Sequence, residues 1–212
     1  MLKEGIISVN KPKGPTSHDI IYQVRRLSGI KKVGHAGTLD PLASGVLVVA
    51  IGREFTKQID QIVKTEKEYV ATVKLGENST TDDAEGEKTV VNNELEVSRE
   101  QVDESLNKFI GQIDQIPPAF SAIKIGGRKA YDMARKGQVV DMKSRQILIK
   151  EIEVIEYKWP VLEIRVVCGS GTYIRSLARD IGKELETGAY LQDLVRTRVG
   201  EYKIEDSINL DQ

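Results

Sequence analysis

The sequence contains few of the residues that support a secreted, membrane-spanning or metal-binding protein. It has one cysteine, Cys168, so no disulfide can form within the chain, and a reducing compartment is the simplest setting. The two histidines, His18 and His35, do not combine with Cys168 in the spacing of a zinc site, so we expect no metal. No apolar run approaches the roughly 20 residues of a membrane span, and the first residues lack the features of a signal peptide. We therefore expect a cytoplasmic protein with no membrane partner.

Charge is nearly balanced overall but unevenly distributed. The net charge is −1, yet residues 1–35 carry seven Lys or Arg against two acids, and residues 121–150 carry eight against two. Residues 77–104 carry ten acids against two bases. Clustered positive charge produces a local field that attracts a polyanion such as nucleic acid. Such runs can equally be solvated faces, so composition leaves both interpretations open.

The sequence also lacks two nucleotide-binding motifs. It has neither the glycine-rich phosphate loop of NTPases nor the glycine fingerprint of dinucleotide-binding folds, which counts against both classes.

Hydrophobic periodicity predicts strands and helices in alternation, and thus an α+β fold. A predicted β-hairpin implies antiparallel pairing, so we expect a mixed sheet within one domain spanning 1–212. The acidic stretch at about 77–97 is expected to be a flexible excursion. The predicted strands are 5–11, 46–51, 67–76, 146–157 and 161–168, and the predicted helices begin near Thr16 or Ser17, at Ser98, after Tyr173 and after Gly188. Expected inward-facing residues include Leu27 and Ile110, with Leu191, Leu194 and Val195 in the last helix.

The stretch GHAGTLDPLASG (residues 34–45) places Asp40 among three glycines and a proline. Asp-Pro is a common turn starter, so the residue can be purely structural. Two features favour a functional role: Gly37 and Gly45 permit close approach by another molecule, and a buried strand directly follows the loop. A carboxylate ionised at neutral pH can act as a nucleophile, a base or a stabiliser of positive charge.

Four further residues are candidates, and each has a structural alternative. His35 lies near Lys31 and Lys32 and can stack on a base or bind a phosphate, or it can be an ordinary polar residue. Arg175 is either solvated or buried beside an acid, and Asp40 would suit as that acid. Tyr69 and Tyr173 can line a site or simply pack in the fold.

Seven motifs, in order along the chain, resemble the bacterial tRNA pseudouridine-55 synthase family (the TruB type). They are VNKPKGPTSHD, GHAGTLDPLASGVL, KEYVATVKLG, TTDDAEG, IPPAFSAIKIGGRKAY, CGSGTYIRSLARDIG and GAYLQDLVRTRVG. The resemblance implies isomerisation of the T-loop uridine of tRNA to pseudouridine, without cofactor or metal. It also implies the pseudouridine synthase fold, a bent, mixed and mostly antiparallel sheet flanked by helices. We expect a monomer that needs no protein partner.

The same resemblance assigns the site residues. It implies that Asp40 is the catalytic aspartate, Tyr69 an active-site tyrosine and Arg175 the arginine that pairs with the aspartate. Tyr173 would line the pocket, and His35 would help to extrude the target nucleotide. Lys11 and Asp83 would bind substrate in less defined roles. Many family members continue into a C-terminal RNA-binding domain of the PUA type, which we do not expect here because the sequence stops at Gln212.

Three other functions remain open at this stage. The chain can be a non-catalytic RNA-binding module or RNA chaperone, in which case replacing Asp40 would leave its function intact. It can be a nucleoside or glycoside hydrolase, which would release free uracil. It can also be a guide-RNA-dependent synthase that works inside a multiprotein complex.

Overall fold

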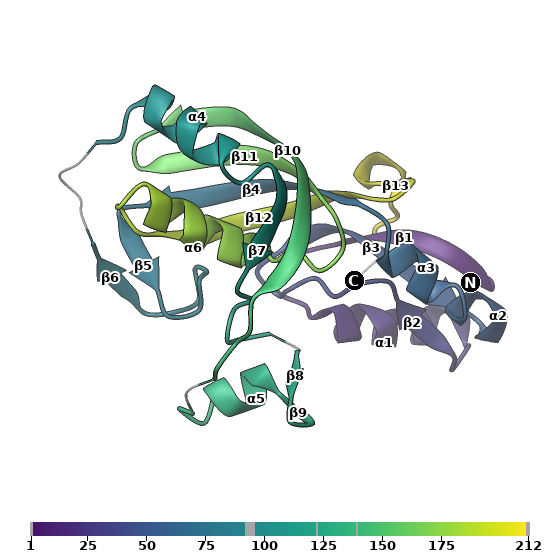
Figure 1. Ribbon diagram of the computed structural model, residues 1–212. Helices are drawn as coiled ribbons and strands as arrows, with labels where there is room; N and C mark the ends of the chain where they lie inside the picture. Colours follow the sequence, from purple (N-terminus) through teal and green to yellow (C-terminus); the bar gives the residue numbers. More distant parts are fainter. Residues whose placement is uncertain (1, 92–95, 122, 139, 211–212) are drawn as a thin grey trace. The chain divides into compact units, whose positions relative to one another are not determined.

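The computed structural model describes residues 2–91, 96–121, 123–138 and 140–210 (Figure 1). It divides into two compact units. Unit 1 comprises Met1–Val70, Arg165–Ser170 and Leu194–Gln212, and unit 2 comprises Ala71–Ile164 and Gly171–Asp193. Three strands have residues in both units: β4 (Lys67–Leu75), β11 (Val161–Cys168) and β12 (Ala189–Val199).

Unit 1 is built around strand β3, the apolar run that the sequence predicts as buried. Strands β1 and β2 pair antiparallel with β3, whereas β12 pairs parallel with it, placing Arg196 beside Gly45. The sheet is therefore mixed, as expected. The elements confined to unit 1 are β1 (Gly5–Lys11), α1 (Ser17–Ser28), β2 (Val33–His35), β3 (Ser44–Ile51), α2 (Arg53–Thr56), α3 (Ile59–Val63), β13 (Tyr202–Lys203) and a 3₁₀ turn (Ile204–Asp206).

Helix α1 begins and ends where its sequence predicts. Thr16 caps the N-terminus and forms a capping box with Asp19, and Gly29 closes the C-terminus in the left-handed conformation. The face that carries Ile20 and Ile21 is buried, but Leu27 in the last turn is 37% exposed. The prediction that Leu27 faces inward is wrong, because the buried stripe of the helix runs through Ile20, Val24 and Ser28 and leaves Leu27 beside it.

The core of unit 1 lies under β3. Ala36, Val46, Val48 and Val199 are fully buried there, and side chains from α3 and the C-terminal segment pack against them. Because successive strand residues point to opposite faces, Val46 and Val48 share one face of β3. This packing gives the loop before β3, residues 34–43, a rigid support.

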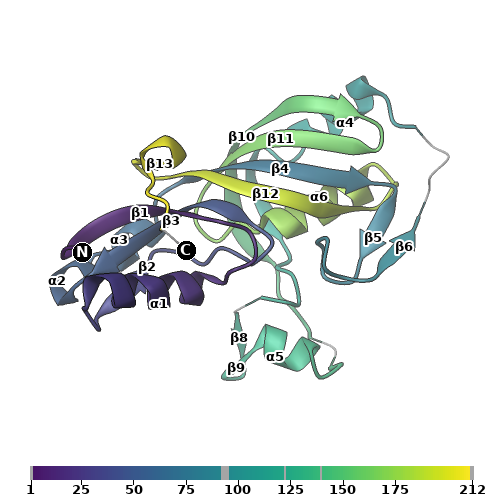
Figure 2. The same ribbon diagram turned by 180° about the vertical axis from the view of Figure 1, so that it is seen from behind.

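Unit 2 holds a sheet with the strand order β12-β4-β11-β10-β7. Helix α6 lies against one face of these strands (Figures 1 and 2), and its Leu177 and Ile181 are buried. The predicted hairpin is confirmed as β10 and β11. The elements confined to unit 2 are β5 (Glu77–Ser79), β6 (Lys88–Val90), α4 (Arg99–Asn107), β7 (Gly111–Gln115), β8 (Lys124–Ile125), β9 (Arg128–Lys129), α5 (Ala130–Ala134), β10 (Arg145–Lys158) and α6 (Ile174–Glu184).

Two sequence-based expectations in this part of the chain are wrong. The segment after Gly188 is not a helix but strand β12, because pairing with neighbouring strands overrides the helix-like spacing of Leu191, Leu194 and Val195. Helix α4 keeps its predicted capping box at Ser98 but ends at Asn107, which leaves Ile110 43% exposed.

The acidic stretch contains ordered structure near its start. Strands β5 and β6 form an antiparallel hairpin that joins Glu77 to Val90, whereas residues 92–95 lie outside the described residues. The flexibility of 77–97, like the single-domain boundary, stays a prediction. No helix within the described ranges has the length and hydropathy needed to span a membrane.

Candidate active site

Asp40 lies in a loop whose backbone is held on both sides of the aspartate. The Leu39 N–H donates to the Ser17 hydroxyl at 2.8 Å, and that hydroxyl donates to the Leu39 carbonyl at 2.9 Å. On the other side, the Gly14 N–H donates to the Pro41 carbonyl at 2.8 Å. The Asp40 carbonyl itself accepts from the Ala43 N–H at 3.1 Å, which is the predicted turn. The turn therefore holds the half-buried Asp40 in a fixed position.

The buried arginine Arg196 binds the same loop from strand β12. Its guanidinium donates to the carbonyls of Gly37 at 3.2 Å, Thr38 at 3.3 Å and Val46 at 2.7 Å. The side chain is only 1% exposed, so these carbonyls replace water around its charge. Sequence analysis did not identify Arg196. Once 189–199 is taken as a strand, Arg196 falls two residues after the inward-facing Leu194 on the same face, and this signal could have identified it.

Gly45 is required by the packing of β3 against β12. Its φ is +103°, and a Cβ on Gly45 would lie 2.2 Å from the Arg196 carbonyl oxygen. The glycine therefore admits a neighbouring strand of the same chain, a structural use that the sequence did not distinguish from approach by another molecule.

Lys11 is a buried cation near Asp40. Its side chain is inaccessible to solvent, and its ammonium donates to the carbonyls of Pro12 and Pro15, both at 2.8 Å. Burial lowers the pKa of Lys11 to about 8, and the charge of Arg196 acts in the same direction, whereas the carboxylate of Asp40 raises it. Lys11 thus shapes the loop that leads to α1 and contributes positive charge beside Asp40.

Tyr69 lies near Arg196 and Asp40. It is 7% exposed on β4, and burial raises the pKa of its hydroxyl, as does the charge of Asp40. A hydrogen bond with Arg196 and the charge of that guanidinium act in the opposite direction. Tyr69 therefore stays protonated at neutral pH and presents an apolar ring with a polar tip.

The two histidines of the chain contact each other. The rings of His18 and His35 meet edge to face with centroids 5.9 Å apart. His35 Nδ1 is buried without a hydrogen-bond partner among the described residues, and burial lowers the pKa of His35, as do the charges of His18 and Arg196. His35 is therefore neutral at pH 7, whereas His18 is exposed. Sequence analysis did not identify this pairing, because the two residues lie far apart along the chain.

A third buried cation, Lys67, repeats the pattern of Lys11 and Arg196. Its ammonium donates to the carbonyls of Val63 at 2.8 Å and Thr65 at 2.7 Å. Burial lowers the pKa of Lys67, and Arg196 lowers it further. Unit 1 thus holds three buried cations, each bound by main-chain carbonyls, and Asp40 carries negative charge near Lys11 and Tyr69.

In unit 2, Arg175 is buried with an acidic partner. Its Nη1 lies 3.3 Å from Asp83 Oδ2, with side-chain exposures of 8% and 5%, and its Nη2 donates to the Phe120 carbonyl at 3.0 Å. Asp83 also accepts hydrogen bonds from the Thr81 hydroxyl and the Glu85 N–H. The expected burial of Arg175 beside an acid is therefore found with Asp83. The pairing of Arg175 with Asp40 stays a prediction.

A second arginine of α6 repeats this contact one turn later. Arg179 Nη1 lies 2.9 Å from Asp82 Oδ2. Burial raises the pKa of Asp82, and the Arg179 charge and hydrogen bond partly counteract that rise. Because residues four apart lie on one helix face, Arg175 and Arg179 together bind consecutive acids of the TTDDAEG motif.

Tyr173 is held at the start of α6. Its N–H donates to Gln115 Oε1 at 2.9 Å, and its carbonyl accepts from Gln115 Nε2 at 3.1 Å. This reciprocal pair joins the residue to the end of β7, and fixes the backbone from which the half-buried Tyr173 ring projects.

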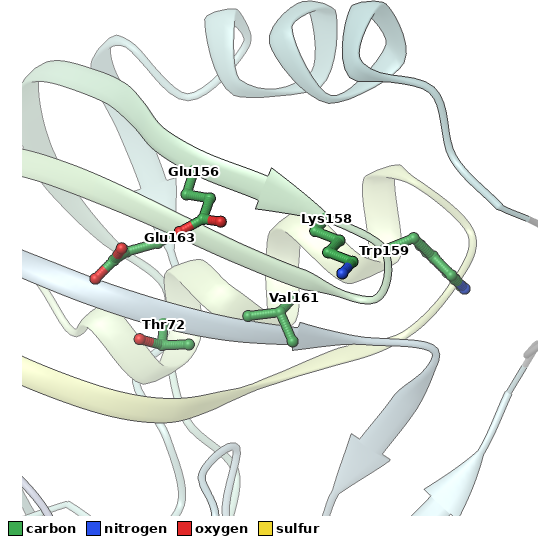
Figure 3. Close-up of a pocket in the computed structure, with 6 residues that line it drawn as sticks. All are labelled: Thr72, Glu156, Lys158, Trp159, Val161 and Glu163. Carbon is green, nitrogen blue, oxygen red and sulfur yellow. The ribbon is translucent and has the colours of Figure 1, made fainter.

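A pocket of about 450 Å³ also opens in unit 2, on the strands β4, β10 and β11 (Figure 3). Its lining includes none of the predicted site residues, so it does not define the site. Its lining residues are Thr72, Glu156, Lys158, Trp159, Val161 and Glu163.

The described residues include no cluster of three His, Cys, Asp or Glu side chains arranged to hold a metal ion. Cys168 is buried and, as the single cysteine of the sequence, forms no disulfide within the chain. Unit 1 carries Asp40, Tyr69, Lys11 and His35, and unit 2 carries Arg175, Asp83 and Tyr173.

Comparisons with known proteins match nearly the whole chain. The family model described as TruB family pseudouridylate synthase (N terminal domain) matches residues 25–174, and that described as tRNA pseudouridylate synthase B C-terminal domain matches residues 175–212. A tRNA pseudouridine synthase B from Phocaeicola vulgatus is 46% identical over 99% of this chain and 92% of that protein. The protein of the same name from Parabacteroides distasonis is 50% identical over 94% and 87%.

Solved structures agree on the fold. The crystal structure of a Cbf5-Nop10-Gar1 complex contains a chain with a TM-score of 0.76 and 33% identity, and the match covers 97% of this chain and 52% of that one. A crystal structure of a pseudouridylate synthase has a TM-score of 0.50 at 17% identity, which supports the fold alone. The expected α+β pseudouridine synthase fold is confirmed.

Proposed function

The chain belongs to the TruB family of pseudouridylate synthases, and on that premise we propose that it converts a uridine of tRNA, at position 55 of the T-loop, to pseudouridine. The observation that carries the proposal is the immobilised loop around Asp40, whose neighbours Leu39 and Pro41 are both fixed by hydrogen bonds. A carboxylate held in this way suits chemistry that needs one precisely placed acid group.

The reaction breaks the N1–C1′ glycosidic bond of uridine, turns the uracil and rejoins it to the sugar through C5. The C5 proton is then lost and N1, freed from the sugar, takes up a proton, so the product has the same mass as the substrate. Asp40 assists by attacking the sugar or the base, or by removing the C2′ proton. Where the glycosidic bond breaks with positive charge developing at C1′, the negative charge of Asp40 stabilises that charge, as carboxylates do in glycoside hydrolysis. Arg175 pairs with Asp40 in the assembled site and orients it.

The detached uracil must stay in place while it turns. Tyr69 and Tyr173 supply aromatic walls that confine the base, and the protonated Tyr69 hydroxyl adds a hydrogen-bonding tip. The target base is stacked within a folded loop, so it must be flipped out at a cost of a few kcal/mol. His35, neutral and in ring contact with His18, helps to extrude the target nucleotide.

The remaining residues support tRNA binding and the site's electrostatics. The positive segments 1–35 and 121–150 contact the tRNA backbone, so affinity decreases as salt rises. Lys11 contributes positive charge beside Asp40, and Asp83 fixes Arg175 from behind. The reaction uses no cofactor or metal, and the enzyme acts in the cytoplasm as a monomer without an obligatory protein partner.

The decisive experiment incubates the purified chain with an unmodified tRNA transcript and maps pseudouridine by carbodiimide modification and reverse transcription. We expect one new stop, at the T-loop uridine. Asp40→Asn should abolish product while tRNA binding persists. Asp60→Asn is the matched control, because Asp60 is an exposed acid on α3 in the same unit, and it should remain fully active.

Other outcomes identify the alternatives. Release of free uracil would indicate a hydrolase, and full function of Asp40→Asn would indicate an RNA-binding module. A requirement for a guide RNA or a partner protein would indicate a synthase that works within a complex. Each of these results contradicts the proposal.

A further inference from the structure

Arg196 on strand β12 donates hydrogen bonds to main-chain carbonyls on both sides of Asp40. One guanidinium group binds Gly37 and Thr38, just before Asp40, and also Val46, just after the loop. Arg196 also lies close enough to Tyr69 for its positive charge to lower the pKa of the Tyr69 hydroxyl. Arg196 therefore joins the two ends of the loop beside the tyrosine of the same site.

The partners of Arg196 indicate that it does not bind substrate. At 1% exposure, its guanidinium has no surface to offer a ligand. A planar guanidinium has five N–H donors in a fixed geometry, so carbonyls bound at several of these donors are held at set angles to one another. Such a group sets the shape of the loop, and the flexible ammonium of a lysine cannot hold the carbonyls in the same arrangement.

On the basis of the proposed function, we propose that Arg196 is a positioning residue that sets the location of Asp40 in the site. It acts through the carbonyls of Gly37, Thr38 and Val46, and it touches neither the base nor the sugar. Its loss should therefore reduce the rate of the chemical step and leave the binding of tRNA almost unchanged.

The test compares Arg196→Met, Arg196→Lys and the control Arg198→Met. Arg198 lies two residues further along the same strand, where it pairs with Glu66 at 2.8 Å and donates to the Gly200 carbonyl at 3.1 Å. Within the part of the chain that the structure describes, the hydrogen bonds and ion pairs of Arg198 do not involve the Asp40 loop. Its replacement therefore removes an arginine of β12 without releasing that loop. Single-turnover kinetics on tRNA give the rate constant and the apparent affinity separately.

A misplacement of about 1 Å costs roughly 100-fold in rate, so Arg196→Met should lose about that factor in rate constant, with affinity within about threefold of wild type. Arg196→Lys should recover part of the loss, since it keeps the charge and reaches some of the carbonyls. Arg198→Met should match wild type. Equal rate constants for Arg196→Met and wild type would overturn the inference, and so would a loss confined to affinity.

Hydrogen exchange distinguishes a failure of this inference from a failure of the proposed function. In Arg196→Met, the amides of residues 36–40 should exchange faster than in wild type while the amides of β10 and β11 do not change. If the wild-type protein makes no pseudouridine, the proposed function fails. Hydrogen exchange at residues 36–40 then still tests whether Arg196 holds the loop. Unchanged exchange at 36–40 overturns the inference, whatever the activity.

Discussion

Removing either member of the Arg175–Asp83 pair should destabilise the protein far more than breaking an exposed ion pair. Both side chains are at least nine-tenths buried, and the charged atoms lie 3.3 Å apart. A single replacement breaks this buried ion pair, which costs about 3–5 kcal/mol. The perturbations are Arg175→Met, Asp83→Asn and the double variant.

The remaining contacts place the expected cost at the lower end of that range. Without Arg175, Asp83 keeps its bonds from the Thr81 hydroxyl and the Glu85 N–H. Without Asp83, Arg175 keeps its bonds to the carbonyls of Phe120 and Thr81. Each single variant should therefore lose about 3 kcal/mol. The double variant should lose less than the sum, with a coupling energy of about 2 kcal/mol.

The assay is urea unfolding of all four proteins, followed by fluorescence and circular dichroism, with unchanged m-values. Glu54 on α2 and Lys57, the residue after that helix, provide the control cycle, because their side chains are 74% and 61% exposed. That pair should couple by no more than about 0.5 kcal/mol, and salt should weaken it. The reasoning is refuted if the Arg175–Asp83 energies are additive within about 0.5 kcal/mol.

Two further predictions concern unit 1. The folded protein loses the Lys11 proton near pH 8, whereas the unfolded chain keeps it to about pH 10.5. Between these pH values the unfolding free energy of wild type, relative to that of Lys11→Met, should therefore rise with pH. A difference that stays flat or falls contradicts this prediction. Gly45→Ala should destabilise by roughly 1–3 kcal/mol more than Gly111→Ala. The two glycines have similar φ values, +103° and +105°, but of the two only Gly45 would bring a Cβ against a neighbouring backbone. Equal losses of unfolding free energy in urea would show that the close approach of β12 to Gly45 carries no cost.

Local signals in the sequence predict individual elements well. The capping boxes at Thr16 and Ser98 are found where the sequence places them, because an N-cap depends on residues three positions apart. The hairpin of β10 and β11 likewise follows from two runs of β-forming residues. These features need no knowledge of distant parts of the chain.

Features set by distant contacts were missed. Leu191, Leu194 and Val195 have the spacing of one helix face, but this segment pairs with β3 and forms a strand. The burial of Arg196 also depends on distant contacts. An arginine is normally exposed, and this one is buried because the main-chain carbonyls of Gly37 and Thr38, far away in the sequence, accept its hydrogen bonds. Asp83 was named as a site residue, but its pairing with Arg175 depends on how the TTDDAEG loop meets α6.

The three buried cations of unit 1 bind carbonyl oxygens of the main chain, and this determines which positions tolerate change. Every amino acid has that oxygen, so substitutions at Thr38, Val63 or Thr65 leave an acceptor in place for Arg196 or Lys67. No substitution at Arg196, Lys67 or Lys11 preserves the donor in the same way. Mutational scanning of unit 1 should therefore find that the acceptor positions tolerate substitution and the three donor positions do not, even though each donor and its acceptors form the same hydrogen bonds.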